Sequence, residues 1–304
     1  MTIRTGPGAA TRAAVGTTQA ATDGPANATA DRTTHGITGS TTQDAEGGAA
    51  DGTGDGAAGW TKSTRLRPVV EVWWAEVSQA RDESAADLDE VEQGRWAAYR
   101  RDEDRARFLL GVTMVRRLLG ARFSLPPAKV RLDRTCPDCG KPHGKVRAEG
   151  VELSVTHSGD LVGVAVTDHP VGLDVEKVAP RLDVDGVAQL ALTPEEIQEL
   201  NRYDGIEKVR AFMTYWTRKE AVVKATGEGL RADLRAVAAT PVPATPVAAS
   251  PAATDAVVAA DAVVGDGMQV CDLPVAPDHV AALAVVSAKP PVVRTFRFGF
   301  DPLR

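Results

Sequence analysis

The sequence has few cysteines, few aromatic residues and no long apolar run. Only 3 cysteines occur among 304 residues, which excludes a disulfide framework and indicates a reducing compartment. No segment approaches the roughly 20 consecutive apolar residues that span a bilayer. No continuous apolar segment follows the early arginines, as it would in a secretory signal. We therefore expect a soluble, cytoplasmic protein without a membrane partner.

A basic excess is also lacking. The formal net charge is −6, whereas proteins that bind nucleic acid in general carry the positive charge needed to neutralise phosphates. Arginines are nevertheless concentrated in one short region, where they alternate with Asp102, Glu103 and Asp104. For most of them we expect a solvated helix face, and the alternative is a site for a small phosphorylated ligand. They are Arg95, Arg100, Arg101, Arg105, Arg107, Arg116, Arg117 and Arg122.

Two stretches differ in composition from the rest of the chain. From position 1 to 60 the only large aliphatic residues are Ile3, Val15 and Ile37, too few to offset the entropy of ordering the chain. We expect a disordered tail there. A second stretch, at about 238–267, is rich in Ala, Val, Pro and Thr, and we expect a flexible insertion.

Strand and helix patterns occur together between these stretches and predict an α+β fold. The sequence LTPEEIQEL has the capping box of a short helix, with Thr193 as N-cap and Glu196 three residues later. The other expected elements are a strand at 69–77, helix from about 88 to 120 with breaks, two strands within 151–168 joined by a turn at 158–160, a strand at 170–178, a helix from about Glu207 and two or three strands within 268–298.

The segment CPDCGKPH forms a tight cysteine-containing turn. Cys136, Cys139 and His143 supply three plausible zinc ligands, but no fourth is nearby in sequence. A structural zinc site is tetrahedral with four ligands, and Cys271 is the only other thiol. A reduced, ordered turn is therefore the favoured interpretation, and metal binding by these residues stays open.

Carboxylates are paired in the strand expected at 170–178. Asp174 and Glu176 lie two residues apart, so their side chains leave the same face of a strand. If a helix carrying Glu220 packs across them, three acids meet. Two carboxylates about 4 Å apart repel by about 4 kcal/mol at an effective dielectric of about 20, so a cation or a retained proton is required. Hard oxygen ligands with room for phosphate indicate Mg²⁺.

The segment WTRKEAVVKATGEGL, residues 216–230, combines an aromatic residue, a carboxylate and an ammonium group. Trp216, Glu220 and Lys224 are four residues apart and share one face of a helix. Simpler interpretations exist for each residue. Glu220 and Lys224 suit an ordinary helix ion pair, Trp216 suits the core, and His157, at a strand end, suits a hydrogen-bonded turn.

Three motifs together resemble the surfactin-type 4′-phosphopantetheinyl transferases. They are THSG at 156–159, VGLDVE at 171–176 and the segment at 216–230, and RFLLG at 107–111 and GKP at 140–142 fit as well. The resemblance covers roughly 69–287, without the insertion. It implies an α+β fold in which two similar halves, 61–169 and 170–304, are related by approximate twofold symmetry, and a chain that acts as a monomer.

The resemblance also implies an activity. Coenzyme A would bind in the cleft between the halves, and its phosphopantetheine arm would pass to a serine of an apo carrier protein, with adenosine 3′,5′-bisphosphate as the other product. Carriers of fatty acid, polyketide and nonribosomal peptide synthesis remain open as partners. Two alternatives are a noncatalytic module that binds carrier proteins and a Mg²⁺-dependent phosphohydrolase.

The roles of individual residues follow from the same resemblance. Asp174, Glu176 and Glu220 would hold Mg²⁺, and Glu220 would also act as the base on the carrier serine. Lys224 would neutralise the leaving phosphate.

Four further positions match residues that contact coenzyme A. His157 corresponds to a histidine that contacts a phosphate of coenzyme A, and Arg107 and Lys141 match basic positions near the nucleotide and its 3′-phosphate. Thr156 stands where the family commonly has serine, and we expect its hydroxyl to keep the hydrogen bond.

Overall fold

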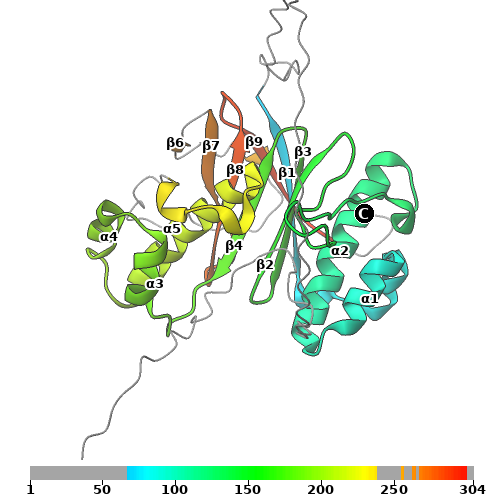
Figure 1. Ribbon diagram of the computed structural model, residues 1–304, viewed down its shortest axis with the longest axis horizontal. Coiled ribbons are helices and arrows are strands. Elements are labelled where there is room, and N and C mark those ends of the chain that lie inside the picture. Colours follow the sequence, from blue (N-terminus) through cyan, green and yellow to red (C-terminus); the bar gives the residue numbers. More distant parts are fainter. Residues whose placement is uncertain (1–66, 238–254, 257–261, 265–266, 300–304) are drawn as a thin grey trace, which may run out of the picture.

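The computed structural model describes residues 67–237, 255–256, 262–264 and 267–299. The expected N-terminal tail at 1–60 lies outside these residues. Most of the insertion expected at 238–267 also lies outside them. Within the described part of the chain the expected α+β class is observed, with helices and two β-sheets (Figure 1).

The first sheet has the strand order β2-β3-β1-β9-β5. All its neighbouring strands are antiparallel except β1 and β9, which run parallel. Two helices, α1 and α2, accompany it. The bounds are β1 Val69–Glu76, α1 Glu90–Ala98, α2 Asp102–Phe123, β2 Glu152–Ser158, β3 Leu161–Thr167, β5 Asp255–Ala256 and β9 Val292–Arg297.

The second sheet has the strand order β4-β8-β7-β6 and is antiparallel throughout. Three helices accompany it. The bounds are β4 Val171–Lys177, α3 Val184–Ala191, α4 Pro194–Leu200, α5 Gly205–Thr226, β6 Ala262–Val264, β7 Met268–Leu273 and β8 His279–Val286. Short 3₁₀ helices connect several elements, at Val77–Gln79, Asp82–Asp87, Pro127–Lys129, Gly229–Arg231 and Leu234–Ala236.

The sheets lie in the middle of the molecule and the helices lie outside them. Figure 1 shows α1 and α2 on one side of the strands and α3, α4 and α5 on the other. One buried cluster joins strands of both sheets, with Val72 from β1, Leu173 from β4 and Leu283 from β8. Each sheet therefore buries one face against the other sheet and its second face against helices.

Most elements expected from the sequence are present. The helix expected at 88–120 is divided into α1 and α2 by the short segment between Tyr99 and Arg101. The capping box of α4 is formed by Thr193 and Glu196 as expected. The strands within 268–298 are β7, β8 and β9.

Strand β9 was expected, but its partner was not. Val69 lies opposite Val292 in the parallel pair of β1 and β9. A boundary at His169 separates β1, β2 and β3 from the strands of the second sheet, yet β9 returns to the first sheet. The two sheets therefore do not correspond to two uninterrupted stretches of chain.

Arg116 is an exception to the solvated helix face expected for most of the arginines. Its side chain is fully buried, and it pairs with Glu92 and Asp89 while donating to the carbonyl oxygens of Pro127 and Val130. A buried guanidinium with carboxylate and carbonyl partners is a structural group that joins α1 to α2 and the following loop.

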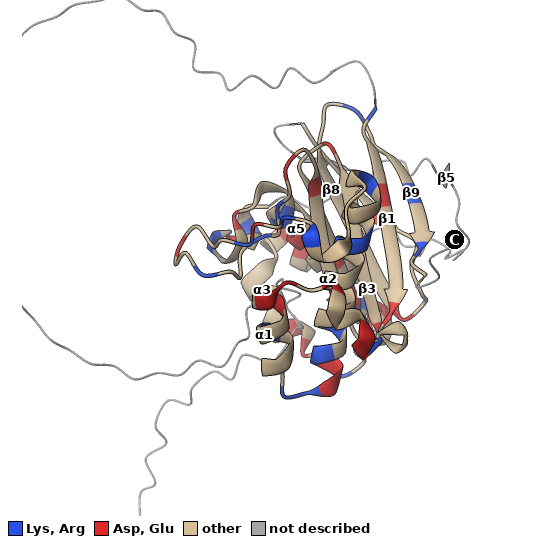
Figure 2. Cartoon of the chain, turned by 90° about the vertical axis from the view of Figure 1, so that its right-hand side faces the viewer, with Lys and Arg blue, Asp and Glu red and all other residues tan. Residues whose placement is uncertain are grey.

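Arg101, the N-cap residue of α2, and Arg105 fit the expectation better. Arg105 pairs with Asp82, and Arg101 pairs with Glu103 and Asp104 near the start of the helix. Figure 2 shows acidic and basic residues interspersed along the elements that face the viewer. No helix of the described chain has the length and apolar character needed to cross a membrane.

Candidate functional site

The site is built where helix α5 crosses strand β4. A Cβ atom placed on Gly172 of β4 would lie 1.8 Å from the carbonyl oxygen of Ala221 and 2.6 Å from the amide nitrogen of Ala225. Only glycine permits this approach of helix backbone to strand backbone. The helix that carries Glu220 and Lys224 is thereby placed directly on the strand that carries Asp174 and Glu176.

Lys224 joins the two motifs. Its ammonium lies 2.7 Å from Oδ1 of Asp174 and also donates to the carbonyl oxygen of Leu173 at 3.1 Å and the hydroxyl of Thr156 at 3.4 Å. Three acceptors match the three N–H donors of a lysine. The salt bridge of Lys224 is therefore made to Asp174 on β4 and not to Glu220 within the helix.

Three hydroxyl groups of β2 bond to the backbone of β4, although these strands belong to different sheets. The amide nitrogen of Leu173 donates to Ser154 and that of Val175 donates to Thr156, at 2.9 and 3.1 Å. Ser158 continues the series two residues later. We call residues 154, 156 and 158 the hydroxyl ladder. It fixes THSG beside VGLDVE, because alternate side chains of a strand point the same way.

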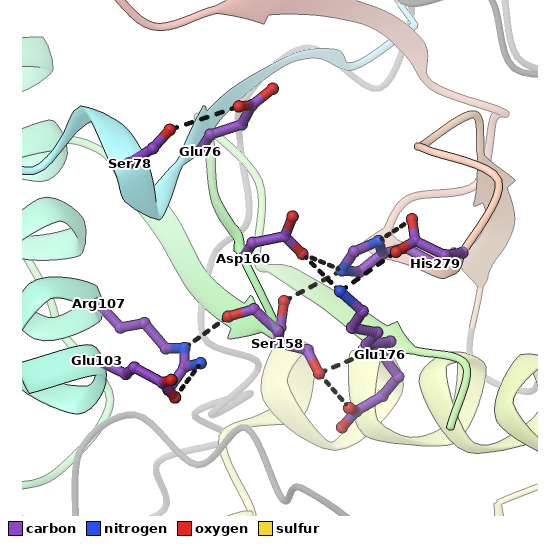
Figure 3. Close-up of polar contacts among 11 residues, drawn as sticks. Glu76, Ser78, Glu103, Arg107, Ser158, Asp160, Glu176 and His279 are labelled. Atoms are coloured by element: carbon purple, nitrogen blue, oxygen red, sulfur yellow. Dashed lines mark hydrogen bonds and ion pairs between the residues drawn. The ribbon is translucent and has the colours of Figure 1, made fainter. Parts of the chain in front are cut away.

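Ser158 extends the ladder into the acidic residues. Its hydroxyl accepts a hydrogen bond from the amide nitrogen of Lys177 at 3.1 Å and donates one to Oε2 of Glu176 at 2.7 Å (Figure 3). The other oxygen of Glu176, Oε1, is buried and accepts no hydrogen bond from the described residues. Glu176 therefore has an oxygen for which the surrounding protein supplies no donor.

The electrostatic environment disfavours ionised carboxylates. Burial, reinforced by the charge of Asp174, raises the pKa of Glu220 to about 7. Burial and the same neighbour raise the pKa of Glu176 well above its ordinary value, against the lowering effect of Ser158. A cation bound nearby would lower the pKa of both carboxyl groups, since a positive charge favours the ionised form.

The residues fit a hard cation by chemistry, but they are not arranged around one in the structure. Asp174, Glu176 and Glu220 are not a group whose ligand oxygens all lie within 4.8 Å of one another. Lys224 lies against Asp174 as its counter-charge. Two features are consistent with a Mg²⁺ site, since Mg²⁺ prefers carboxylate oxygens. They are the Glu176 oxygen that accepts no hydrogen bond and the raised pKa values of Glu176 and Glu220.

His157 lies at the end of β2, next to two ladder residues. Burial, followed by the charges of Lys224 and Arg107, lowers its pKa to about 4. The imidazole is therefore neutral near pH 7. A neutral imidazole under the influence of two cations keeps one N–H donor, which suits an anion that the cations also attract.

Arg107 connects α2 to the turn that follows β2. Its Nε donates to the carbonyl oxygen of Gly159 at 2.7 Å, and its other nitrogens pair with Asp104 and Glu103 (Figure 3). The side chain is 18% exposed. The structure thus brings Arg107 to the same turn as His157, on the side of the first sheet.

Two expected ligand-binding residues differ in their surroundings. Thr156 is buried, and its hydroxyl is already engaged by Val175, Asp174 and Lys224. Lys141 is exposed, and its ammonium has no hydrogen bond or ion pair with the described residues. Contact of either residue with coenzyme A stays a prediction.

Several residues of the motif on α5 are structural. Trp216 is buried in the cluster that α5 forms with α3 and α4, as expected. Arg218 pairs with both oxygens of Asp272 at 2.8 Å. Lys219 is fully buried and pairs with Glu196 of the α4 capping box. These contacts fix the rotation of α5, so that Glu220 and Lys224 face β4.

Sequence reasoning missed the ladder serines and the charged residues beyond them. Lys177 pairs with Asp160 and Asp278 at 3.1 and 3.2 Å, and His279 contacts both of these acids. These contacts tie the turn after β2 to the second sheet (Figure 3). The signal for Ser154 and Ser158 was the alternation of hydroxyl residues along a strand whose neighbours are apolar.

Comparison with known proteins gives the family. A model described as the 4′-phosphopantetheinyl transferase superfamily matches residues 170–283. The 4′-phosphopantetheinyl transferase HetI of Nostoc sp. is 30% identical over 220 residues, which are 68% of this chain and 92% of HetI. The chain belongs to the 4′-phosphopantetheinyl transferase superfamily. The expected resemblance to this superfamily is thereby confirmed, and the protein is a transferase.

Two surfactin-type relatives match over shorter stretches. The transferase psf-1 of Bacillus pumilus is 30% identical over 136 residues, 45% of this chain and 56% of psf-1. Sfp of Bacillus subtilis is 29% identical over 132 residues, 43% of this chain and 57% of Sfp. This transferase is therefore aligned with little more than half the length of these two relatives.

Proposed function

We propose that this transferase moves the 4′-phosphopantetheine arm of coenzyme A to a serine of an apo carrier protein, in a Mg²⁺-dependent reaction that releases adenosine 3′,5′-bisphosphate. The contact of Lys224 with Asp174 carries the proposal. This contact holds the motif at 216–230, most of which lies on α5, against VGLDVE of β4. These two motifs also carry Glu220 and Glu176. The hydroxyl ladder holds THSG of β2 against β4 beside them.

The proposed reaction is one displacement at phosphorus. The serine oxygen of the carrier forms a bond to the phosphorus that bears the pantetheine group, and the bond from that phosphorus to the leaving phosphate oxygen breaks. Glu220 takes the serine proton, directly or through a water molecule, as the general base. Lys224 compensates the charge on the leaving phosphate.

Asp174, Glu176 and Glu220 would hold the Mg²⁺ ion. When bound, the ion supplies positive charge beside the pyrophosphate and reduces repulsion among the three acids. His157 would donate a hydrogen bond to a phosphate oxygen. Arg107 and Lys141 would contact the nucleotide and its 3′-phosphate, and Thr156 would hold β2 against β4 beneath them.

The arrangement of the two sheets suits the symmetric fold expected from the sequence. We propose that the halves are related by an approximate twofold axis. Each half packs a 22-residue helix, α2 or α5, against its sheet, and each of these helices ends at a residue of left-handed conformation, Ser124 or Gly227. A chain with both halves can act as a monomer.

Two further features belong to the proposal. Cys136, Cys139 and Cys271 are free thiols, which suits the reducing cytoplasm. The carriers would be those of polyketide, nonribosomal peptide or fatty acid synthesis, which the resemblance to the surfactin-type transferases leaves open. HetI, psf-1 and Sfp, to which this chain is similar, are 4′-phosphopantetheinyl transferases.

Reconstitution tests the proposed function. Purified protein is incubated with Mg²⁺, coenzyme A and a panel of apo carriers, and each carrier is weighed by intact-protein mass spectrometry. We expect the mass of one phosphopantetheine group on at least one carrier, and none on a carrier whose acceptor serine is replaced by alanine. A folded protein that modifies none would refute the transfer, and coenzyme A breakdown without a carrier would identify a phosphohydrolase instead.

A further inference from the structure

A second cluster of metal-binding side chains lies outside the candidate active site. Cys136, Cys139 and His143 each place one ligand atom within 4.8 Å of the other two. Sγ of Cys139 is 2.9 Å from Nε2 of His143. Around a tetrahedral zinc ion a sulfur and a nitrogen ligand lie about 3.5 Å apart. Cys139 and His143 therefore need to move apart by well under an ångström to accommodate the ion.

The backbone of this loop holds the three side chains together. The amide nitrogen of Cys136 donates to the carbonyl oxygen of Lys141, and that of Gly140 donates to the carbonyl oxygen of Cys136, both at 2.9 Å. Gly140 has a φ of 70°, a conformation that favours glycine. The loop is therefore closed on itself before any ligand binds, which lowers the entropic cost of coordination.

Glycine is also required at the end of the loop. A Cβ atom on Gly144 would lie 2.6 Å from the carbonyl oxygen of Thr135. The amide nitrogen of Gly144 itself donates to the carbonyl oxygen of Arg134 at 2.6 Å. Both glycines thus serve the geometry that brings His143 back to the cysteines.

Backbone donors surround one of the two sulfur atoms. The backbone N–H groups of Asp138 and Cys139 hydrogen-bond to the sulfur of Cys136, which places it on the inner side of the loop. Asp138, the carboxylate within the loop, pairs with Arg231 at 3.6 Å. A zinc ion with two thiolates has no net charge, so binding leaves no uncompensated charge at this surface.

Another cluster with metal-binding side chains differs in one respect. Asp160, Asp278 and His279 also lie within 4.8 Å of one another. Lys177 places its ammonium against both carboxylates, so that cluster already contains its cation (Figure 3). No described basic side chain forms an ion pair with Cys136, Cys139 or His143, which makes the cysteine loop the better metal site.

We propose that Cys136, Cys139 and His143 bind one Zn²⁺ ion, with a water molecule as the fourth ligand. Both thiols lose their protons to solvent on binding, and His143 coordinates through a ring nitrogen in its neutral form. Three protein ligands and one water complete the tetrahedron. The ion fastens the loop that carries Lys141, whose backbone lies between the ligands.

The experiment measures metal binding and does not depend on transfer activity. The protein is reduced with a phosphine, stripped of metal and titrated with zinc chloride against a chromophoric chelator. We expect one Zn²⁺ per chain. Cys136→Ser, Cys139→Ser and His143→Ala should each weaken binding by more than about 100-fold, above the 10–100-fold typical of groups around a metal site that are not ligands. Cys271→Ala and Asp174→Asn should leave the affinity unchanged.

Cobalt provides a second readout, because Zn²⁺ itself has no d–d spectrum. Co²⁺ should give the absorption of a tetrahedral site with thiolate ligands, and each cysteine variant should weaken the sulfur-to-cobalt band while circular dichroism stays that of the parent. Reduced, folded protein that binds no Zn²⁺ would overturn the proposal. So would affinity unchanged in His143→Ala, or lost in Asp174→Asn.

Discussion

The Ser158 hydroxyl donates to Glu176 while it accepts from the backbone of Lys177, at 2.7 and 3.1 Å. One hydroxyl therefore holds a proposed metal ligand and also fixes the end of β2 to the end of β4. Its donated hydrogen bond favours the ionised carboxylate, against the burial that raises the pKa of Glu176.

Ser158→Ala should weaken Mg²⁺ binding more than coenzyme A binding. Loss of the donor raises the pKa of Glu176 further, and a buried polar group left without its partner costs about 1–3 kcal/mol of stability. We expect about a tenfold higher Mg²⁺ concentration for half-maximal transfer, with a smaller change in KM for coenzyme A. Ser78→Ala is the matched control, since Ser78 is exposed and its hydroxyl lies 3.5 Å from Glu76. An equal response of the two variants would contradict the role of Ser158.

Glu220→Gln should remove most transfer and leave the fold intact. The amide keeps the shape of the side chain but removes a ligand charge and the proposed base, and general-base catalysis typically contributes about 10²–10⁴-fold. The measurement is single-turnover transfer to an apo carrier, with thermal unfolding as the check of folding. Turnover within a factor of a few of the parent would exclude Glu220 as the base.

Arg107→Ala should weaken the binding of coenzyme A more than that of dephospho-coenzyme A. The proposed contact is with the 3′-phosphate, which only the first of these ligands has, and a charge-assisted hydrogen bond is worth about 1.5–3 kcal/mol. We expect at least a tenfold rise in KM for coenzyme A alone. Arg105→Ala is a control on the same helix, since Arg105 pairs with Asp82 outside the site. An identical change in KM for both ligands would refute contact with the 3′-phosphate.

Metal-free protein should lose a contribution to stability as the pH rises. The folded pKa of Glu220 is about 7, above the ordinary value of 4.5, so its contribution is fully present below the unfolded pKa and is lost as pH rises through about 7. Mg²⁺ favours the ionised form and should restore stability at high pH. The rise in Tm caused by Mg²⁺ should therefore be larger at about pH 8 than at about pH 5. Glu220→Gln should reduce this difference, and a rise in Tm independent of pH would contradict the assignment.

Gly172→Ala should separate α5 from β4. The added methyl group meets helix backbone at 1.8 Å, which no side-chain rotation relieves. We expect a loss of about 3 kcal/mol or more in unfolding free energy, with a matching fall in Tm. Gly94→Ala is the control, because that residue lies on α1 with nothing within 4 Å of the new Cβ. It should raise stability by up to about 1 kcal/mol through helix propensity. Equal effects would show that the close contact is not required.

Local patterns in the sequence predicted most elements and the residues of the candidate site. Alternation and helical spacing depend on neighbours along the chain, so β4, α5 and the turn after β2 were accessible. The pairing of Lys224 with Asp174 could not be predicted from local patterns, because Asp174 is 50 residues away in the sequence. Lys219 and Arg116 could not be recognised as buried, since their acidic partners lie on other helices.

The sheet to which β9 belongs could not be predicted either, because its partner strand β1 is distant in the sequence. A strand pattern at 292–298 specifies an element but not the sheet that receives it. The pairing of Val69 with Val292 depends on the packing of the whole molecule.

That pairing has a consequence for synthesis of the protein on the ribosome. Strand β1 is made early and can pair with β3 on one edge, but its other edge waits for β9, more than 200 residues later in the chain. Until β9 leaves the ribosomal tunnel, the nascent chain presents an open strand edge that can pair with another chain. Chaperone occupancy of nascent chains should therefore persist beyond translation of the codons for 292–297, until β9 has left the tunnel.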